Sequence, residues 1–488
     1  MNSELILILD FGGNQAYYTA RRLRGERVYC EILPGDTPVE AIRAREPLGV
    51  ILAGGDTNAL RAEPLPFEPD AFGVPLMAFG GASRMLAERI GAAHQGIRLQ
   101  QDKDFVQFLP CPLFESLSEN DRFFERVDGF ELPEDYKPVA TTPSGLAPAF
   151  ACPEKGIYAL QFYVESNDPD GLKILENFAV GICGAARNWS VENFAPKLIE
   201  RVREELADQN VLLPVSGGVD TAVTAVLLDR AIGGRLNCLF IDTGLLRKGD
   251  PEFARRFFYE QMNMSLTEVD ARDRFMKALR GVTDPEKKRR AMHDELSAVF
   301  AEQYIKAGNI DCMAEATIYP DVIKARPPMI GELIEGCRRI EPLRLLFKED
   351  VRALGRYLGI PEEMISRPSF ESSGLSVRCL GEVTPEKLHM LREADAIFRA
   401  EVENAGLNRK IAQYFAILTD LKTPGLHGEG YVCVLRALGS SNAGRAPAYK
   451  LPYDLMGAVV QRITDEVPGI THVVYDITGR PIAAAEWE

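Results

Sequence analysis

The sequence has no apolar run long enough to cross a membrane, and no basic cluster precedes its first apolar segment at 4–11. We therefore expect no signal peptide, no membrane partner and a cytoplasmic location. The nine cysteines form no CxxC pair, and we expect scattered reduced thiols, which are usual in a cytosolic protein.

Positive charge is in the minority. The chain has 56 Lys and Arg against 71 Asp and Glu, a formal net charge of −15. This balance argues against a nucleic-acid partner. The length of 488 residues allows two to four domains, and 46% hydrophobic with 26% charged residues is ordinary for a globular protein.

Apolar runs with the pattern of buried parallel strands alternate with amphipathic segments through much of the chain. Such runs occupy 4–11, 49–55, 211–215 and 236–244, whereas after residue 100 the pattern predicts shorter, Pro-rich elements. Beyond a Pro, Ser and Gly-rich stretch at 367–374, helical segments and strands follow. We predict an α/β fold with two doubly wound parallel-sheet domains followed by a smaller α+β domain, over 1–183, 184–366 and 367–488.

A glycine-rich loop, "SGGVDT" at 216–221, stands between a buried strand and a helix. Gly217 and Gly218 let backbone amides approach an anion, and the helix dipole adds to the attraction. The GxxxxGK[ST] pattern of a Walker A loop is absent. The segment resembles the SGGxD[ST] loop of the ATP pyrophosphatases, which implies ATP and Mg²⁺ as cofactors and adenylylation of a carbonyl oxygen.

Along its whole length the chain resembles the glutamine-hydrolysing GMP synthases. The segments that carry this resemblance are "LDFGGNQAYYTARRLR" (9–24), "CGAARNWSVENF" (183–194), "FIDTGLLRKGD" (240–250), "GVTDPEKKRR" (281–290), "TIYPDVI" (317–323), "PLRLLFKEDVRALGRYLGIP" (342–361) and "VVYDITGRPIAAAEWE" (473–488). The resemblance implies a class I glutamine amidotransferase domain, an ATP pyrophosphatase domain and a C-terminal dimerisation domain.

The amidotransferase part departs from the family at two places. At the strand-to-helix turn "AFGGAS", Gly80 stands where the family has its nucleophilic cysteine. In the second signature, Tyr163 stands at the position of the base histidine, while Glu165 is retained. Without a thiolate and an imidazole, glutamine hydrolysis has no route. We predict that this domain is catalytically inactive.

The resemblance also assigns the synthetase residues. It implies an ATP site at Ser216, Gly217, Gly218, Val219, Asp220, Thr221, Asp242, Thr317 and Asp321, with Asp220 and Lys324 in catalytic roles and Asp220 as the metal residue. Asp220 orients the loop or joins a Mg²⁺ shell, and Asp242 accepts from adenosine or caps its loop. The acceptor nucleotide is assigned to Gln413, Arg480 and Glu486.

Two segments near the acceptor are remodelled. The family's lid becomes "KARPPMIGEL" (324–333) without its histidines, and its Pro-Gly-rich turn becomes "SFESSGL" (369–375). We predict a homodimeric ligase that adenylylates XMP or a related purine nucleotide and admits ammonia from solution or a separate subunit. The same ATP chemistry on a different acceptor in a specialised nucleoside pathway, or a non-catalytic nucleotide-binding paralogue, are the alternatives.

Overall fold

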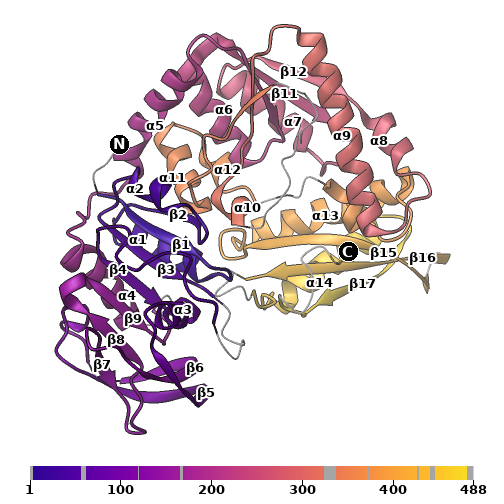
Figure 1. Cartoon of the computed structure of the whole chain (residues 1–488). Helices are drawn as coiled ribbons and strands as arrows, with labels where there is room; N and C mark the ends of the chain where they lie inside the picture. Colours follow the sequence, from indigo (N-terminus) through magenta and orange to yellow (C-terminus); the bar gives the residue numbers. More distant parts are fainter. Residues whose placement is uncertain are drawn as a thin grey trace. The chain divides into compact units, whose positions relative to one another are not determined.

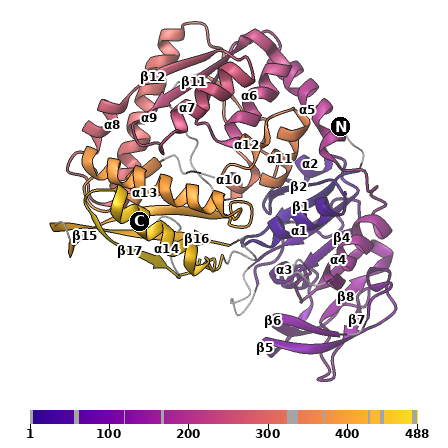
Figure 2. The same cartoon turned by 180° about the vertical axis from the view of Figure 1, so that it is seen from behind.

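The computed structural model describes residues 4–55, 62–118, 120–164, 169–323, 337–368, 370, 373–425, 428–439, 446–480 and 487. The chain folds into two units, unit 1 (Met1–Asn193) and unit 2 (Phe194–Glu488). Figures 1 and 2 show them from opposite sides. Among the described residues, no helix has the length and apolar character needed to span a membrane.

Unit 1 is built on a nine-stranded sheet in the order β2-β1-β3-β4-β9-β8-β7-β5-β6. The first five strands of this order run parallel, and the remaining four are added antiparallel. The strands are β1 (Ile6–Asp10), β2 (Cys30–Pro34), β3 (Gly49–Ala53), β4 (Leu76–Phe79), β5 (Ala93–Phe108), β6 (Asn120–Glu131), β7 (Lys137–Thr141), β8 (Ala149–Cys152) and β9 (Ile157–Leu160). The helices are α1 (Gln15–Gly25), α2 (Val39–Arg43), α3 (Gly81–Arg89) and α4 (Pro169–Glu176), with short turns η1 (Pro112–Phe114), η2 (Pro153–Lys155) and η3 (Asn177–Ile182).

The apolar runs of unit 1 form its buried strands. Every residue of β3 and β4 is buried, which is expected where helices cover both faces of a parallel sheet. The prediction of only short elements after residue 100 is wrong, because β5 and β6 form a long antiparallel hairpin. Their sequences "QQDKDF" and "NDRFFER" are rich in charge and lack a clear period of two, so the alternation that marks a strand is hidden.

Unit 2 contains a five-stranded parallel sheet, β12-β11-β10-β13-β14, and a three-stranded sheet, β15-β16-β17. The strands are β10 (Val211–Val215), β11 (Leu236–Asp242), β12 (Leu266–Asp270), β13 (Cys312–Ala314), β14 (Arg338–Ile340), β15 (Gln413–Gly425), β16 (Gly428–Leu438) and β17 (Ile470–Asp476). The helices are α5 (Val191–Leu206), α6 (Val219–Ile232), α7 (Asp250–Arg255), α8 (Arg272–Ala278), α9 (Pro285–Ala307), α10 (Tyr319–Ile323), α11 (Lys348–Tyr357), α12 (Glu362–Ile365), α13 (Pro385–Asn404) and α14 (Tyr453–Glu466), with short turns η4 (Gly233–Arg235), η5 (Arg256–Gln261) and η6 (Gly374–Arg378). Helix α5 begins just before the boundary between the units.

The arrangement of unit 2 brings several loops to one edge. Because β10, β11 and β13 are parallel neighbours, their carboxyl ends meet at the same edge of the sheet, where ligands of open α/β sheets bind. Helices α13 and α14 pack on each other and on the three-stranded sheet. The predicted fold class is confirmed. The boundaries at 183 and 366 stay a prediction.

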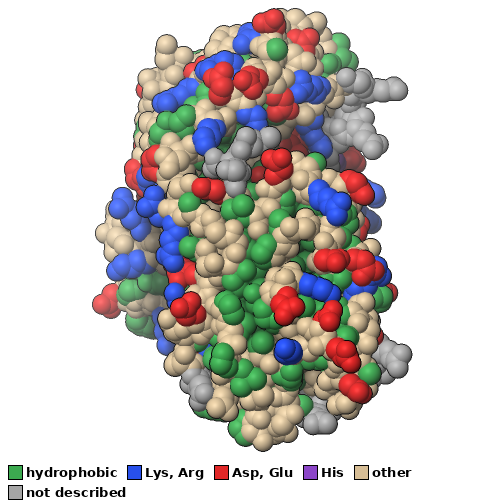
Figure 3. Space-filling view, turned by 60° about the vertical axis from the view of Figure 1, so that its left-hand side comes forward, with side chains coloured by type: hydrophobic (Ala, Val, Ile, Leu, Met, Phe, Trp, Pro, Cys, Tyr) green, Lys and Arg blue, Asp and Glu red, His purple; other side chains and the backbone are tan. Residues whose placement is uncertain are grey.

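Charged side chains of both signs share the surface. On the face in Figure 3, hydrophobic side chains gather in the middle and lower part, and Lys and Arg lie among Asp and Glu around them. The nine cysteines are all free thiols. Burial raises the pKa of the Cys183, Cys238 and Cys433 thiols to about 12, so these three are poor nucleophiles at neutral pH.

Candidate functional site

The loop at 216–221 turns the chain from β10 into α6. Gly217 has a φ of +72°, and a Cβ added there would lie 3.3 Å from the Cβ of Ala254. The Ser216 Oγ accepts from the Gly218 N–H (3.3 Å), and the Thr221 hydroxyl donates to the Gly218 carbonyl oxygen (3.0 Å). The first amides of a helix have no carbonyl partner within it. The loop is therefore held by its own hydroxyls in a form that leaves amides for an anion.

The carboxylate of Asp220 is held by a lysine from α11. The Lys348 Nζ lies 2.8 Å from Oδ1 and 2.7 Å from Oδ2 of Asp220. The two side chains are 22% and 29% exposed, so this ion pair is reachable from solvent. Asp220 is thus anchored at the first turn of α6 by a residue 128 positions further along the chain.

A second cation supports the other end of the loop. The Arg367 guanidinium donates to the Gly217 carbonyl oxygen (2.7 Å), pairs with Asp250 and lies over the Phe253 ring at 4.1 Å from its centre. Burial lowers the pKa of Arg367 to about 10. Asp250 also pairs with Arg247 at 3.0 Å, and both of those side chains are buried. Through the hydrogen bond from Arg367 to Gly217, this network holds the backbone of the loop in place.

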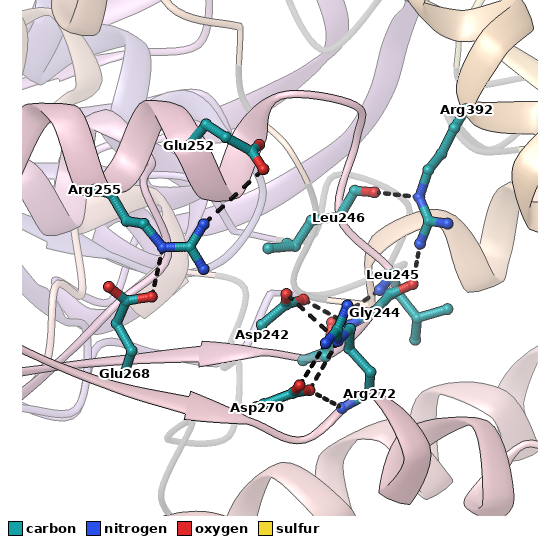
Figure 4. Close-up of polar contacts among 11 residues, drawn as sticks. Asp242, Gly244, Leu245, Leu246, Glu252, Arg255, Glu268, Asp270, Arg272 and Arg392 are labelled. Atoms are coloured by element: carbon teal, nitrogen blue, oxygen red, sulfur yellow. Dashed lines mark hydrogen bonds and ion pairs between the residues drawn. The ribbon is translucent and has the colours of Figure 1, made fainter.

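Next to the loop, β11 ends in Asp242 at the rim of a cavity of about 460 Å³. The Asp242 Oδ1 accepts from the Gly244 N–H (2.9 Å), and Arg272 lies at 4.0 Å from Oδ2 (Figure 4). Arg272 binds Asp270 through two nitrogens, which lowers the pKa of Asp270 to about 2. The Asp242 carboxylate therefore caps its own loop, and the residue also lines the cavity, so its predicted contact with adenosine stays a prediction.

The remaining walls of this cavity are strongly polar. Arg392 donates to the Leu246 carbonyl oxygen (3.0 Å) and to that of Gly244, and Arg255 binds Glu268 (2.6 Å), as Figure 4 shows. Burial lowers the pKa of Arg392. A ligand here meets fixed guanidinium and carboxylate groups together with the apolar side chains of Phe240 and Val269.

The third strand end carries Thr317 and Asp321. Both follow β13, and the Asp321 Oδ2 accepts from the Ile318 N–H at 3.2 Å, which caps the start of α10. Since β13 is the neighbour of β10, the structure brings these two residues to the same sheet edge as the loop. Lys324 lies outside the described residues.

Two of the predicted acceptor residues share one end of the three-stranded sheet. Gln413 begins β15 and pairs with Leu438, and Arg480 forms a backbone bridge with Ala446 just beyond that end. Close by, the buried Arg436 binds Asp476 at 3.1 Å, and the Trp487 indole donates to the same carboxylate at 2.6 Å. Glu486 lies outside the described residues.

In unit 1, the turn between β4 and α3 has the geometry of a nucleophile-bearing turn. Gly80 has a φ of +61°, and a Cβ added there would lie 3.6 Å from the Tyr163 ring. The two positions noted in the sequence therefore face each other. Gly81 packs directly on the loop after β3, since a Cβ on it would lie 2.5 Å from the Gly55 carbonyl oxygen. Glu165 lies outside the described residues.

Known proteins match the chain along its length. The model of the GMP synthase C terminal domain matches residues 400–487. The chain is 38% identical to the glutamine-hydrolyzing GMP synthase of Clostridium acetobutylicum over 510 residues, and 39% identical to that of Clostridium tetani over 514, covering 100% of each chain in both comparisons. The chain belongs to the GMP synthase family. Among solved structures, the NH3-dependent NAD synthetase of Campylobacter jejuni aligns at 19% identity with a TM-score of 0.32, over 36% of this chain and 77% of that one.

The structure of this GMP synthase family member adds site residues that the sequence analysis missed. Lys348 and Arg367 contact the loop at 216–221, and Asp250 links Arg367 to Arg247, yet no spacing rule connects these residues with the loop. The segment "LFKEDVR" that contains Lys348 contributes to the family resemblance. That resemblance is the signal that could have singled out this lysine.

Metal-binding side chains are sparse at the loop. Among the residues that the structure describes, no group of three or more His, Cys, Asp or Glu is arranged to hold a metal ion. Mg²⁺ that travels with a nucleotide commonly takes only one or two carboxylates and completes its shell with phosphate and water. Asp220 fits that role, because each carboxylate oxygen keeps a second lone pair beside the bond from Lys348.

Proposed function

We propose that this protein is an ATP-dependent carbon–nitrogen ligase of the GMP synthase type. It adenylylates an oxo group of XMP or a related purine nucleotide and replaces it with ammonia, releasing AMP and pyrophosphate. The observation that carries the proposal is the phosphate loop, which lies at the carboxyl edge of the parallel sheet with Asp242, Thr317 and Asp321 on the neighbouring strand ends.

The loop residues act on the leaving group. As the acceptor oxygen bonds to the α-phosphorus of ATP, negative charge grows on the departing pyrophosphate. The amides at the start of α6 and the helix dipole stabilise that charge without having to reorganise. ATP-borne Mg²⁺, held by Asp220, would neutralise part of the same charge.

The amidotransferase-like part supplies no ammonia in this proposal. Hydrolysis of glutamine needs a thiolate and a base, and the facing positions carry Gly80 and Tyr163 instead. Ammonia therefore comes from solution or from a separate subunit. The three predicted domains would then comprise an inactive amidotransferase-like domain, a synthetase domain and an acceptor-binding domain.

The C-terminal part supports the proposed acceptor contacts. Gln413 and Arg480 lie at one end of the three-stranded sheet, where the family resemblance assigns acceptor contacts together with Glu486. The homodimer is proposed on the family resemblance of the C-terminal domain alone.

The proposal is tested with the purified protein, ATP, Mg²⁺ and XMP, with ammonium or glutamine as the nitrogen source. We expect pyrophosphate release and GMP formation with ammonium, and no GMP with glutamine. Pyrophosphate release with another purine nucleotide but not XMP would identify the alternative acceptor. No adenylylation with any purine nucleotide would overturn the ligase proposal and favour the non-catalytic paralogue.

A further inference from the structure

We infer that Phe370 is a positioning residue for the acceptor nucleotide, because two arginines from different parts of unit 2 hold its ring. The guanidinium carbons of Arg247 and Arg378 lie 4.6 and 5.1 Å from the ring centre. The inference deepens the proposed function and rests on it, since it takes Gln413 as an acceptor contact. It names the side chain that keeps η6 in place at the acceptor end of the three-stranded sheet.

The two arginines connect Phe370 to two different regions. Arg247 belongs to the loop between β11 and α7, which lines the cavity of about 460 Å³, and it is itself held by Asp250 at 3.0 Å. Arg378 is the last residue of η6, and its guanidinium carbon lies 3.9 Å from the centre of the Phe415 ring in β15. Phe370 therefore links the loop at the cavity to the three-stranded sheet.

Backbone contacts attach η6 to the same two regions. On one side, the Leu375 N–H donates to the Leu245 carbonyl oxygen at 2.8 Å. Gly374 has a φ of +61°, and a Cβ added there would lie 2.6 Å from that same oxygen. On the other side, the Leu380 N–H donates to the Leu418 carbonyl oxygen of β15 at 2.8 Å. Any displacement of η6 therefore acts on both regions.

The sheet face that η6 contacts also carries an assigned acceptor residue. Side chains two positions apart on a strand point to the same face, so Phe415 shares its face with Gln413. Arg378 contacts the Phe415 ring on that face. The position of η6 therefore determines how much space an acceptor has beside Gln413.

The sequence of this segment does not stiffen it. The stretch "SFESSGL" at 369–375 contains no proline, the residue that fixes φ. Its position must then come from contacts with the rest of unit 2. Cation–π contacts are strongest where the cation is removed from water, and both Arg247 and Arg378 are buried. A site that is ordered before the ligand arrives avoids the cost of ordering it during binding.

A competing account makes Phe370 a mere space-filling residue, since it also packs against the large hydrophobic cluster of unit 2. The two accounts differ in Phe370→Leu, which keeps apolar bulk but removes the aromatic face. If the ring only fills space, the affinity for the acceptor changes no more than the affinity for ATP. If the ring positions η6, the acceptor alone binds more weakly, and Phe370→Tyr, which keeps a ring, binds it normally.

The experiment titrates XMP, and separately ATP with Mg²⁺, into the full chain by isothermal titration calorimetry. We expect Phe370→Leu to raise the Kd for XMP by about 5-fold or more and to leave the Kd for ATP within about 2-fold of wild type. Phe370→Tyr should bind both ligands with nearly wild-type affinity. Unchanged XMP affinity in Phe370→Leu overturns the inference, as do equal losses for both ligands, a loss in Phe370→Tyr as large as in Phe370→Leu, or a wild-type protein that does not bind XMP.

A matched control is available at the other end of the same sheet. Lys387 and Lys422 lie over the Tyr431 ring at 5.6 and 5.0 Å from its centre, and Tyr431 pairs with Lys422 far from Gln413. Tyr431→Leu thus removes a ring with two cation partners, and we expect wild-type XMP affinity from it. A loss as large as in Phe370→Leu would show general damage to the sheet and overturn the inference.

Two outcomes separate this inference from the proposed function. If Phe370→Leu fails to fold, Phe370→Met keeps more of the apolar bulk without the ring, and its XMP affinity decides the question. XMP binding needs no reaction, so a protein that binds XMP in a Phe370-dependent way but releases no pyrophosphate would refute the proposed function and leave the inference standing. A protein that makes GMP from XMP with the same KM in Phe370→Leu as in wild type would do the reverse.

Discussion

The turn between β4 and α3 in unit 1 and the turn between β10 and α6 in unit 2 share one backbone plan. In each, a buried strand leads through a glycine of positive φ, +61° at Gly80 and +72° at Gly217, into the first turn of a helix. In both, a hydroxyl donates to the carbonyl oxygen of a turn glycine, Ser83 to Gly80 and Thr221 to Gly218. They differ in charge, because the unit 2 turn carries Asp220 with its lysine partner, whereas the added Cβ of Gly80 would meet the Tyr163 ring.

The two turns are held in different ways. Close backbone packing holds the unit 1 turn, and charged side chains hold the unit 2 turn. Gly81 cannot take a side chain, because its Cβ would lie 2.5 Å from the Gly55 carbonyl oxygen. Close backbone packing therefore fixes the shape of the unit 1 turn. The unit 2 turn is supported by two cations, because Lys348 pairs with the Asp220 carboxylate and Arg367 donates to the Gly217 carbonyl oxygen.

The largest expected effect comes from removing the carboxylate of the unit 2 turn. Asp220→Ala should lower ATP-dependent pyrophosphate release by about 100-fold or more, because Mg²⁺ loses its carboxylate and the loop loses its ion pair with Lys348. An assay that hydrolyses the released pyrophosphate and detects the phosphate formed measures this rate. Gly80→Ala is the matched change at the other turn, and wild-type release is expected from it. If both variants lost pyrophosphate release to the same extent, the two turns would not differ in their contribution to the reaction.

The next effect concerns the clamp on the loop backbone. Arg367→Met removes the hydrogen bond to the Gly217 carbonyl oxygen and one of the two guanidinium partners of Asp250. We expect the free energy of unfolding of unit 2 to fall by about 2–3 kcal/mol, since a buried charge-assisted bond is lost while Arg247 still pairs with Asp250. Urea unfolding followed by fluorescence measures it. A change below about 0.5 kcal/mol would mean that the loop needs no clamp.

A smaller effect is expected from the glycines themselves. Gly217→Ala and Gly80→Ala each place a side chain at positive φ, which costs about 1–3 kcal/mol. The cost should be larger at Gly217, where the added Cβ lies 3.3 Å from Ala254, than at Gly80, where it lies 3.6 Å from Tyr163. Thermal unfolding of both variants compares the two, and a larger loss at Gly80 would contradict this ranking.

The smallest effect is expected from restoring a nucleophile to unit 1. Gly80→Cys should give no glutaminase activity, because Tyr163 supplies no base that activates a thiol at neutral pH. Glutamate formation from glutamine measures it. The double variant Gly80→Cys with Tyr163→His tests whether the missing base is what still prevents glutamine hydrolysis in the single variant. Hydrolysis by the single variant would refute the account of a double loss.

The sequence predicted the strands and the loop well, because their signals are local. The apolar runs at 4–11, 49–55 and 211–215 became β1, β3 and β10, and the glycine-rich segment became the strand-to-helix turn that was expected. The β5–β6 hairpin was missed, because its charged strands show little alternation.

The supports of the loop could not be predicted in the same way. Lys348 and Arg367 become neighbours of the loop only through the packing of α11 and α12 on α6, and no periodicity encodes that contact. The sequence allows Asp242 to contact adenosine or to cap its loop. The structure shows the hydrogen bond from the Gly244 amide at 2.9 Å, and the contact with adenosine stays a prediction. The assigned roles of Lys324, Gln413, Arg480 and Glu486 stay predictions.

The distance in sequence between the loop and its supports has a consequence for synthesis on the ribosome. Lys348 follows Asp220 by 128 residues and Arg367 follows Gly217 by 150. At typical translation rates the loop waits roughly 6 to 30 s before its two partners are even made. The nascent β10–α6 segment therefore reaches its final shape late, and a chaperone or nascent-chain protease would find this turn open during that interval.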